Sequence, residues 1–481
     1  MNNTVQRIAK NTTALLVAQL ISYSLGFFYI MYTARYLGVA GFGILSFALA
    51  FTGIFGVFTD LGLQPLTVRE VARDKSLASK YLANVSTMKV ILVAITFGLI
   101  ALTINLLGYP EQTIKVVYLI ALSVVFHAFT GMFYSIFRAH EKMEYQSLGQ
   151  ILNSVLLLSG AFFLIKQGFG VIGFASLHSL VSAIALGYSF VVCVWKFVLP
   201  KIEINFGFWK TMIKQALPFG LTILFFSLYY RIDMVMLSMM KGNEAVGWYS
   251  AAHRLVFTFA AISGPFLGSF FPVTSRLYQS SKEALIRSSE RAFGYLLMIA
   301  LPIGLGTTIL ASRLISLIYG AEYIPSIIAL QILIWTGVFI FVDVFGNLLG
   351  SIDKQIEMAK VSGICLLVNV VLNLLLIPKY SYVGASIATV ITNIVGIFGL
   401  YGYVVRSGYQ LSNKFLLKKI FKVATATIIM GAYTISFQNV SLLLLVPSSA
   451  MFYFLSFYLL KGFDSEDREL FKKVFTGGNR R

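Results

Sequence analysis

The run FFSLYYRIDMVMLSMM, residues 225–240, is apolar along its whole length except for a charged pair near its middle. No glycine, proline or asparagine interrupts it, so it predicts one continuous helical segment. Together with the apolar residues before it, the run reaches the ~20 residues that a helix needs to cross a bilayer. Arg231 and Asp233 then lie in lipid, where a charge costs at least ~2.5–3.5 kcal/mol unless it meets a partner or a wet cavity. These two residues are therefore the first candidates for function.

The composition extends this interpretation to the whole chain. Its 481 residues are 58% hydrophobic and 12% charged, with a mean hydropathy of +0.82. A soluble domain carries about 25% charged residues, so a water-soluble protein is excluded. Apolar runs of membrane-spanning length recur along the chain, and because they are continuous rather than alternating, they predict helices and not a β-barrel. Cys193 and Cys365 lie inside such runs and indicate neither a disulfide framework nor a zinc site.

The apolar windows and their polar flanks predict about fourteen transmembrane helices, an all-α polytopic membrane protein. The first window begins near Thr12 and has no small-residue cleavage site, which favours a retained span over a signal peptide. The predicted spans are 12–34, 41–61, 85–107, 113–135, 147–166, 171–195, 216–239, 248–271, 291–311, 326–350, 359–377, 383–405, 420–437 and 442–460.

The distribution of lysine and arginine predicts the orientation. Of the 38 such residues, 30 fall on the side of the two termini and six on the opposite side, and Arg231 and Arg254 lie inside spans. The positive-inside rule then places both termini in the cytoplasm of a multi-pass cell (inner) membrane protein. The net charge of +19 follows from this topology and from anionic lipid, without nucleic acid as a partner. The outward loops are too short for an extracellular domain.

A repeat divides the chain into halves. The outward turns GVAGFGILSFA (38–48) and GNEAVGWYSAA (242–252) both fit G-x4-G-x2-S-x-A, and LNSVLLL from Leu152 matches VNVVLNL from Val368. Six spans per half give both halves the same orientation, an arrangement found in alternating-access transporters. We therefore predict two pseudo-symmetric six-helix lobes, 1–200 and 201–405. A segment 406–481 adds a helix pair and a cytoplasmic tail.

Several strings resemble Wzx-type flippases, the polysaccharide-exporter branch of the multidrug/oligosaccharidyl-lipid/polysaccharide superfamily. They are RYLGVAGFG from Arg35, DLGL from Asp60, VREVA from Val68, RIDMVML from Arg231, WYSAAHRL from Trp248, LIYGAEY from Leu317 and NVVLNLLLIPKYSYVGASIAT from Asn369. The resemblance covers nearly the whole chain. It implies fourteen helices in two lobes around a central cleft, and a lipid-linked oligosaccharide as the cargo moved from the cytoplasmic to the outer leaflet.

Four charged or titratable residues lie at similar depth in the seventh and eighth spans: Arg231, Asp233, His253 and Arg254. One interpretation is an ion pair between Asp233 and Arg254 that fixes helix packing. The other leaves Arg231 or Arg254 facing the cleft, where a guanidinium holds a phosphate or pyrophosphate with paired donors. Both can hold at once, because two arginines and one aspartate leave one positive charge over.

The remaining charged candidates lie near span ends or alone. Arg35 is expected to snorkel to the outer interface or to take part in gating, and Lys89 to snorkel or to help admit the cargo from the cytoplasm. Asp60 is expected to cap or end a helix. Asp343 is the lone-carboxylate candidate for a coupling cation, H+ or Na+. Asn369 and Asn373 share a helix face and are expected to hydrogen-bond between helices.

The sequence carries no P-loop and no metal-ligand spacing, so we expect neither nucleotide nor metal cofactor. We therefore predict a transporter and not an enzyme: a flippase for a prenyl-(pyro)phosphate-linked oligosaccharide in surface glycan assembly. Its partners would be that cargo and membrane lipids, with a polysaccharide polymerase or glycosyltransferases as further candidates. Alternatives in the same superfamily are an ion-coupled multidrug exporter and a lipid II flippase. From a different class come a membrane-embedded enzyme and a scaffold of glycan assembly.

Overall fold

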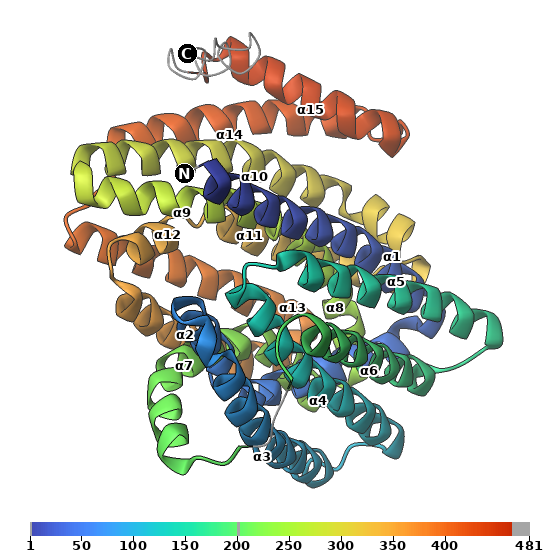
Figure 1. Ribbon diagram of the computed structural model, residues 1–481. Coiled ribbons are helices and arrows are strands. Elements are labelled where there is room, and N and C mark those ends of the chain that lie inside the picture. The colour runs from blue at the N-terminus through green and yellow to red at the C-terminus, as the bar shows by residue number, and fades with distance from the viewer. Residues whose placement is uncertain (1, 200–202, 464–481) are drawn as a thin grey trace. The chain divides into compact units, whose positions relative to one another are not determined.

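The computed structural model describes residues 2–199 and 203–463, with side chains from Leu15 onward except at Thr222. The arginines and lysines of the predicted cytoplasmic tail after Lys461 lie outside the described residues. Within the described ranges every regular element is a helix (Figure 1). The predicted all-α class is therefore confirmed.

Fifteen α-helices and three short 3-10 helices follow one another along these residues. Their bounds are α1 Asn2–Phe55, η1 Gly56–Thr59, α2 Leu63–Arg73, η2 Lys75–Leu77, α3 Ala78–Leu106, α4 Glu111–Ala139, α5 Met143–Gln167, α6 Val171–Lys196, α7 Phe206–Lys241, α8 Asn243–Ala260, α9 Ser263–Ser280, α10 Lys282–Ile318, η3 Ala321–Tyr323, α11 Ser326–Phe341, α12 Val344–Ser351, α13 Gln355–Arg406, α14 Asn413–Ser436 and α15 Leu442–Leu459.

Eleven helical stretches among the described residues are long and apolar enough to cross a membrane. Two of them are far longer than one crossing needs: Leu15–Thr59 has 45 residues and Gln355–Arg406 has 52. Each contains one residue with non-helical dihedral angles, Gly38 (φ 66°, ψ −179°) in α1 and Ser381 (φ 52°, ψ −134°) in α13. These two residues lie in the predicted turns between the first and second spans and between the eleventh and twelfth.

Two predicted spans are wrong as continuous helices. The span at 248–271 is divided, because α8 ends at Ala260 and α9 begins at Ser263. Pro265 therefore lies in the first turn of α9, where its missing N–H breaks no intrahelical hydrogen bond. The span at 326–350 is also divided, and Asp343 stands between α11 and α12 rather than inside a helix.

The two copies of the repeated motif share one backbone geometry. Gly38 and Gly242, at equivalent motif positions, have dihedral angles of 66°, −179° and 81°, −175°. Gly43 and Gly247, also equivalent, sit where α1 crosses α8. A Cβ atom on Gly43 would lie 1.8 Å from the carbonyl oxygen of Asn243, and one on Gly247 would lie 2.2 Å from that of Val39. The contact is reciprocal, because Asn243 and Val39 are themselves equivalent positions in the repeat.

The helices group into two compact units. Unit 1 comprises Met1–Ala251, Ile318–Tyr323 and Ser362–Ala385, and unit 2 comprises Ala252–Leu317, Ile324–Val361 and Ser386–Arg481. This grouping follows helix packing and not the repeat, so the lobes predicted at 1–200 and 201–405 stay a prediction.

Unit 1 is a bundle in which α4 packs against α6 and α3, and α1 packs against α5 (Figure 1). Its main apolar cluster gathers where α2, α3, α4, α6 and α7 meet, and includes Leu82, Phe137 and Cys193. Trp209, at the start of α7, donates from its indole nitrogen to the amide oxygen of Asn84 on α3 at 2.9 Å. This bond satisfies a polar group that the apolar cluster otherwise buries.

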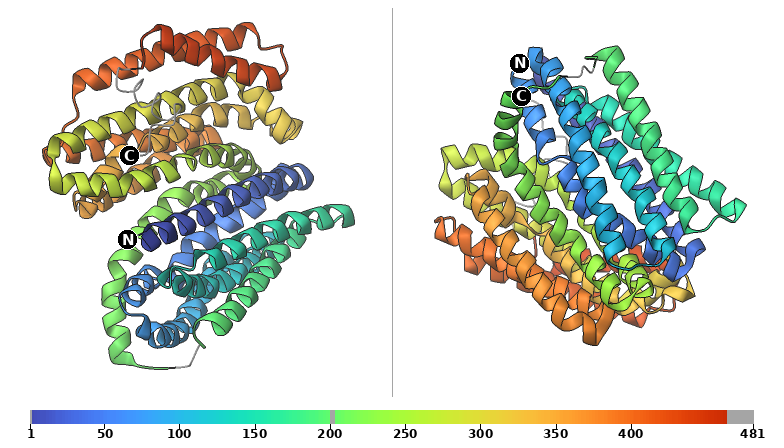
Figure 2. Two further views of the ribbon diagram at one scale, coloured as in Figure 1. Left: turned by 45° about the horizontal axis from the view of Figure 1, so that its top comes forward. Right: turned by 90° about the horizontal axis from the view of Figure 1, so that it is seen from below.

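Unit 2 packs α9 against α12 and α14 against α15, the orange and red pair of Figure 2. One apolar cluster joins α10, α12 and α14 with the end of α13 and with α15. Tyr453 on α15 donates its hydroxyl proton to the carbonyl oxygen of Met298 on α10 at 2.8 Å. The carboxylate of Glu290 accepts from the backbone N–H of Ser412 at 2.6 Å, which ties the start of α14 to α10.

Candidate functional site

Asp233 lies in the C-terminal third of α7 and is buried, with 3% of its surface exposed. Its two carboxylate oxygens have different donors. The Tyr249 hydroxyl of α8 donates to Oδ2 at 2.8 Å, and the Asn373 amide of α13 donates to Oδ1 at 2.7 Å. A carboxylate in a membrane helix is costly unless such donors replace its hydration. These two hydrogen bonds offset part of that cost.

Asn369 extends this polar group by one helical turn. The Asn373 amide nitrogen also donates to the Asn369 amide oxygen, at 2.9 Å, and both side chains are fully buried. Two atoms of the pair, Asn373 Oδ1 and Asn369 Nδ2, have no hydrogen-bond partner. Unpaired polar atoms in a buried site are uncommon, and they often mark the place of an ion, a water or a proton. The predicted hydrogen bonding between helices is confirmed for Asn373, which bonds to Asp233 of α7, whereas the bond of Asn369 described here lies within α13.

Arg231 lies one half-turn from Asp233 on α7 and is half-buried. Its guanidinium donates to the Ser227 hydroxyl at 2.9 Å, and this hydroxyl donates to the backbone carbonyl of Gly53 on α1 at 3.2 Å. A Cβ atom on Gly53 would lie 2.6 Å from the Arg231 Nε atom. Gly53 therefore provides the space in which the guanidinium rests against α1.

Lys89 and Asp60 form an ion pair inside unit 1. The Lys89 ammonium contacts an Asp60 carboxylate oxygen at 2.7 Å and donates to the Thr59 carbonyl at 3.1 Å. The Lys89 side chain is 0% exposed and that of Asp60 is 14% exposed. The snorkelling predicted for Lys89 is therefore wrong. Asp60 does accept from the backbone N–H of Gln64 at 3.2 Å, the capping contact that the sequence predicted.

Arg35 and the short helix η3 form a second polar cluster in unit 1. The Arg35 Nε atom donates to the carbonyl oxygen of Ile318 at 2.8 Å. The Tyr323 hydroxyl lies 2.9 Å and 3.2 Å from the carbonyl oxygens of Ala34 and Gly38. Burial raises the pKa of Tyr323, so its hydroxyl remains protonated and able to donate. These hydrogen bonds therefore hold the segment 318–323 against α1 near the kink of α1 at Gly38.

Arg254 and His253 lie on the part of α8 that belongs to unit 2. Both are half-buried. The ring of His253 stacks on that of Phe257, with centroids 4.1 Å apart. Asp233 belongs to unit 1 and Arg254 to unit 2. The packing within either unit therefore does not test the predicted ion pair between them, which stays a prediction.

Asp343 has a local structural role that its sequence environment did not predict. Its carboxylate accepts from the backbone N–H of Gly346 at 2.9 Å and so caps the N-terminus of α12. Asn347, in the same helix, donates to the Leu267 carbonyl of α9 at 2.9 Å. These contacts explain both polar residues without a bound cation.

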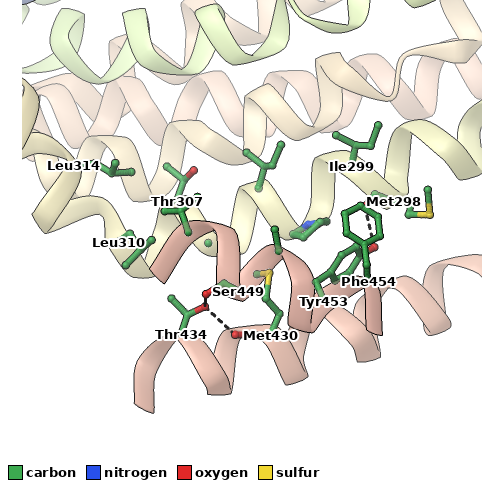
Figure 3. Close-up of a pocket in the computed structure, with 15 residues that line it drawn as sticks. Met298, Ile299, Thr307, Leu310, Leu314, Met430, Thr434, Ser449, Tyr453 and Phe454 are labelled. Carbon is green, nitrogen blue, oxygen red and sulfur yellow. Dashed lines mark hydrogen bonds between the residues drawn. The ribbon is translucent and has the colours of Figure 1, made fainter. Parts of the chain in front are cut away.

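Unit 2 contains an apolar cavity of 410 Å³ between α10 and the α14–α15 pair (Figure 3). The hydroxyl groups of Thr434, Ser449 and Tyr453 at its wall bond to one another or to backbone. Thr434 donates to the Met430 carbonyl at 2.8 Å and pairs with the Ser449 hydroxyl at 3.0 Å. Hydrocarbon from Ile299, Leu310 and similar side chains forms most of the remaining surface. The cavity suits a hydrocarbon chain and not a sugar or a phosphate.

Among the described residues, no group of three or more His, Cys, Asp or Glu is arranged to hold a metal ion. The arrangement around Asp233 is of another kind, one carboxylate with two carboxamides, which are ligands for a hard monovalent cation or a proton. The sequence prediction missed Tyr249. Asp233 stands nine residues before Gly242 and Tyr249 seven after it, so an antiparallel helix pair about that turn brings them to similar depth.

Comparison with known proteins agrees with this architecture. The family model described as "Polysaccharide biosynthesis protein" matches residues 8–278. The capsular polysaccharide biosynthesis protein CapF of Staphylococcus aureus is 24% identical over 83% of this chain and 100% of its own length. The probable low-salt glycan biosynthesis flippase Agl15 of Haloferax volcanii is 20% identical over 90% of each chain. Among solved structures, the lipid II flippase MurJ in an inward closed conformation superimposes with a TM-score of 0.75 at 18% identity, covering 96% of this chain and 99% of MurJ.

Proposed function

Since the chain belongs to the polysaccharide biosynthesis protein family of membrane transporters, we propose that it is a flippase for a prenyl-(pyro)phosphate-linked oligosaccharide. The cargo would move from the cytoplasmic to the outer leaflet of the cell membrane by alternating access. The observation that carries the proposal is Arg231. Its guanidinium is half-buried within a membrane helix, in a space left for it by a glycine. A cation kept at that cost suits an anionic head group.

The phosphate group would be held by the paired donors of a guanidinium, and Arg231 and Arg254 are each candidates for this role. Arg35 and Lys89 were candidates for the same role. Each already has a strong contact, Arg35 with the Ile318 carbonyl and Lys89 with Asp60. We therefore propose them as residues that hold the conformation of unit 1, and that would contact cargo only after these bonds open.

The topology that goes with this function has fourteen spans and both termini in the cytoplasm. Eleven stretches among the described residues qualify by length and composition. Two of these, α1 and α13, are long enough for two crossings each. The lysine-rich α14, which packs against α15, would be the one remaining span in the count of fourteen. The asymmetry of lysine and arginine supports the cytoplasmic placement of the termini.

Asp233 is the candidate for coupling transport to a cation gradient. If a proton binds the carboxylate, the acid would donate to Asn373 Oδ1, which requires the amide to rotate by half a turn. If Na+ binds, the carboxylate and the unpaired amide oxygen would be its ligands. Both alternatives use the unpaired Oδ1 atom of Asn373. Asp343 is a weaker candidate, because capping α12 already accounts for it.

Reconstitution tests the function directly. Purified protein in liposomes would receive labelled lipid-linked oligosaccharide, and the leaflet of the label would be probed with an impermeant reagent. We expect protein-dependent transfer with the glycan unchanged. A chemically altered glycan would indicate an enzyme, and binding without transfer a scaffold. Transfer of lipid II or of cationic drugs in preference to the oligosaccharide would favour the other members of the superfamily.

Substitutions test the site. We expect Arg231→Ala and Arg254→Ala each to reduce transfer more than tenfold at normal membrane levels, because a charged hydrogen bond contributes roughly 1.5–3 kcal/mol. Arg231→Lys should recover only part, because an ammonium lacks the paired donors. Arg73→Ala is the matched control, since its side chain is 69% exposed on α2. Wild-type transfer in both alanine variants would remove the arginines from the cargo path.

Coupling is tested with Asn373→Leu, which removes a donor to Asp233 and the unpaired amide oxygen. We expect transfer that no longer responds to an imposed Na+ or proton gradient. A variant that keeps the full gradient response would exclude this site from coupling.

A further inference from the structure

Unit 1 contains a cavity that the proposed phosphate and cation sites do not use. It has a volume of 570 Å³ and lies among α1, α4, α5 and α6. Its walls come from the last turns of α4 and the first turns of α5, on either side of the turn at residues 140–142. On the proposed topology these helix ends face the cytoplasm. A volume of ~300–1,000 Å³ is typical of small-molecule sites.

The lining of this cavity is polar but neutral. Ten of its thirteen described residues carry an amide, a hydroxyl or an imidazole, and none is Asp, Glu, Lys or Arg: the ten are Gln19, Ser22, Tyr23, His127, Thr130, Tyr134, Gln146, Gln150, Asn153 and Ser154. Hydrogen-bonding groups are costly at membrane depth unless water or a ligand meets them. Some of these side chains bond within the protein, such as Thr130 to the Phe126 carbonyl. Together the ten give the cavity the hydrogen-bonding groups that a polar ligand needs.

Two atoms in the wall have no hydrogen-bond partner among the residues that the structure describes. Gln146 Oε1 and Ser22 Oγ are buried and make no hydrogen bond. Both residues line the cavity, and each oxygen is able to accept a hydrogen bond from a hydroxyl group. In most proteins such atoms are paired, so two in one wall point to a missing donor.

The hydrogen bonds of His127 add a third acceptor. The Ser182 hydroxyl lies 2.7 Å from the His178 carbonyl oxygen and 3.0 Å from His127 Nε2. If the hydroxyl proton is donated to the carbonyl, His127 donates from Nε2. In the neutral ring this leaves Nδ1 as an acceptor. The cavity is thus rich in acceptors, which suits a ligand rich in O–H donors.

A glycine sets the distance between α4 and α5 at this cavity. A Cβ atom on Gly149 would lie 2.1 Å from the Tyr134 hydroxyl oxygen and 3.1 Å from the Tyr188 ring. The aromatic ring of Tyr134 therefore lies close against the α5 backbone at the cavity wall. Aromatic faces beside amide groups are the combination that packs on the apolar face of a sugar ring while bonding its hydroxyls.

We propose that this cavity of unit 1 is the subsite for the sugar portion of the cargo, a neutral, hydroxyl-rich oligosaccharide. The proposal rests on the flippase function and assigns a separate place to each chemical part of the cargo. The phosphate would meet Arg231, and the sugar would meet the neutral amides. The hydrocarbon chain would enter neither, since an apolar surface matches it.

The internal repeat supports the assignment. Asn153, at the second position of LNSVLLL, lines the cavity. Its equivalent at the second position of VNVVLNL is Asn369, in the buried group around Asp233. The same motif position thus carries an asparagine in both halves, and in the first half no carboxylate accompanies it in the lining. The first-half copy therefore retains hydrogen bonding without a charge, as sugar binding requires.

A cysteine protection experiment tests the proposal in the full-length protein. Ser154→Cys places a thiol in the cavity wall, and Ser159→Cys on the same helix is the control, since Ser159 is exposed outside this cavity. The native Cys193 and Cys365 are buried and serve as a low background. The probes are a lipid-linked oligosaccharide extract from membranes of the source organism, and polyprenyl pyrophosphate without sugar.

We expect the oligosaccharide extract to slow labelling of Ser154→Cys at least fivefold, with no effect on Ser159→Cys. Polyprenyl pyrophosphate should protect neither. Equal protection by the two probes, or none by the extract, would overturn the sugar subsite. Transfer by the wild-type protein is measured in parallel. Transfer by the wild-type protein without protection of Ser154→Cys would contradict only the sugar subsite. Protection of Ser154→Cys without transfer would contradict only the flippase function.

A second measurement uses a matched pair of glutamines on α5. Gln146→Leu removes the unpaired acceptor in the wall, and Gln167→Leu makes the same change at the exposed far end of the helix. One lost hydrogen bond corresponds to about a fivefold rise in the apparent KM for the extract. We expect this rise only in Gln146→Leu, with unchanged binding of polyprenyl pyrophosphate. An unchanged KM, or an equal loss of binding for both lipids, would contradict the assignment.

Discussion

The crossing of α1 and α8 provides the sharpest test of the structure. In Gly43→Ala the new methyl group would lie 1.8 Å from the Asn243 carbonyl oxygen, whereas ordinary contact begins at 3.4 Å. The helices must therefore separate by about 1.6 Å, because a backbone carbonyl cannot rotate away as a side chain can. Overpacking of this kind costs roughly 1–3 kcal/mol, and alanine returns at most ~1 kcal/mol through its better helix propensity.

The expected result is a net loss of roughly 1–2 kcal/mol and a melting temperature lower by a few degrees. The assay is thermal unfolding of the purified protein in one detergent, read by tryptophan fluorescence or by loss of the monodisperse peak. Gly26→Ala is the matched control on the same helix, since a Cβ atom there meets nothing within 4 Å. It should melt at the wild-type temperature or slightly above.

The reciprocal contact adds a further requirement. Gly247→Ala should lower the melting temperature by a similar amount, because its Cβ atom would lie 2.2 Å from the Val39 carbonyl. One separation of the helices relieves both clashes, so the double variant should lose less than the sum of the two single losses. The close crossing described here is wrong if Gly43→Ala has the same melting temperature as Gly26→Ala. It is also wrong if the loss in the double variant equals the sum of the two single losses.

Three further substitutions follow from the site. Lys89→Met should lower the free energy of unfolding by roughly 3–5 kcal/mol, because it leaves the Asp60 carboxylate without its buried partner. Adding Asp60→Asn should recover much of the lost melting temperature. Asp343→Ala should cost about 1 kcal/mol through loss of the α12 cap, while Asp343→Asn keeps both stability and transfer; lost transfer in the asparagine variant would return this residue to ion coupling. Gly53→Ala should displace the Arg231 guanidinium and reduce transfer with little change in the melting temperature, and wild-type transfer in a well-folded variant would contradict the seating described for Arg231.

The fold class and the span positions could be predicted from the chain because a bilayer imposes local rules. Each span must be apolar over a fixed length, and each must satisfy its own backbone hydrogen bonds. These rules apply to every window separately, so the predicted spans largely coincide with observed helices. The errors came where a polar residue changes the local geometry. Asp343 was assigned to a helix interior, but its carboxylate caps a new helix and ends the old one.

The partners of the charged and polar residues could not be predicted from the sequence. The sequence identified Asp233, Asn369 and Asn373 as unusual, because polar groups at membrane depth are unusual anywhere. It could not tell that Tyr249 and Asn373 are the donors to Asp233, since this depends on the rotation of α8 and α13 about their axes. Lys89 was placed at a span end, yet its ammonium is turned inward to Asp60.

Hydropathy by itself thus determined that this chain is a polytopic helical membrane protein and where most of its helices run, because each span must be apolar over a fixed length. The polar cavity among α1, α4, α5 and α6 was decided by tertiary structure alone. Its glutamines, asparagine and tyrosines are scattered over four helices, and each is unremarkable in its own window. Only packing shows that they face one space, because the direction of a side chain around a helix is set by the neighbours against which that helix buries its apolar side.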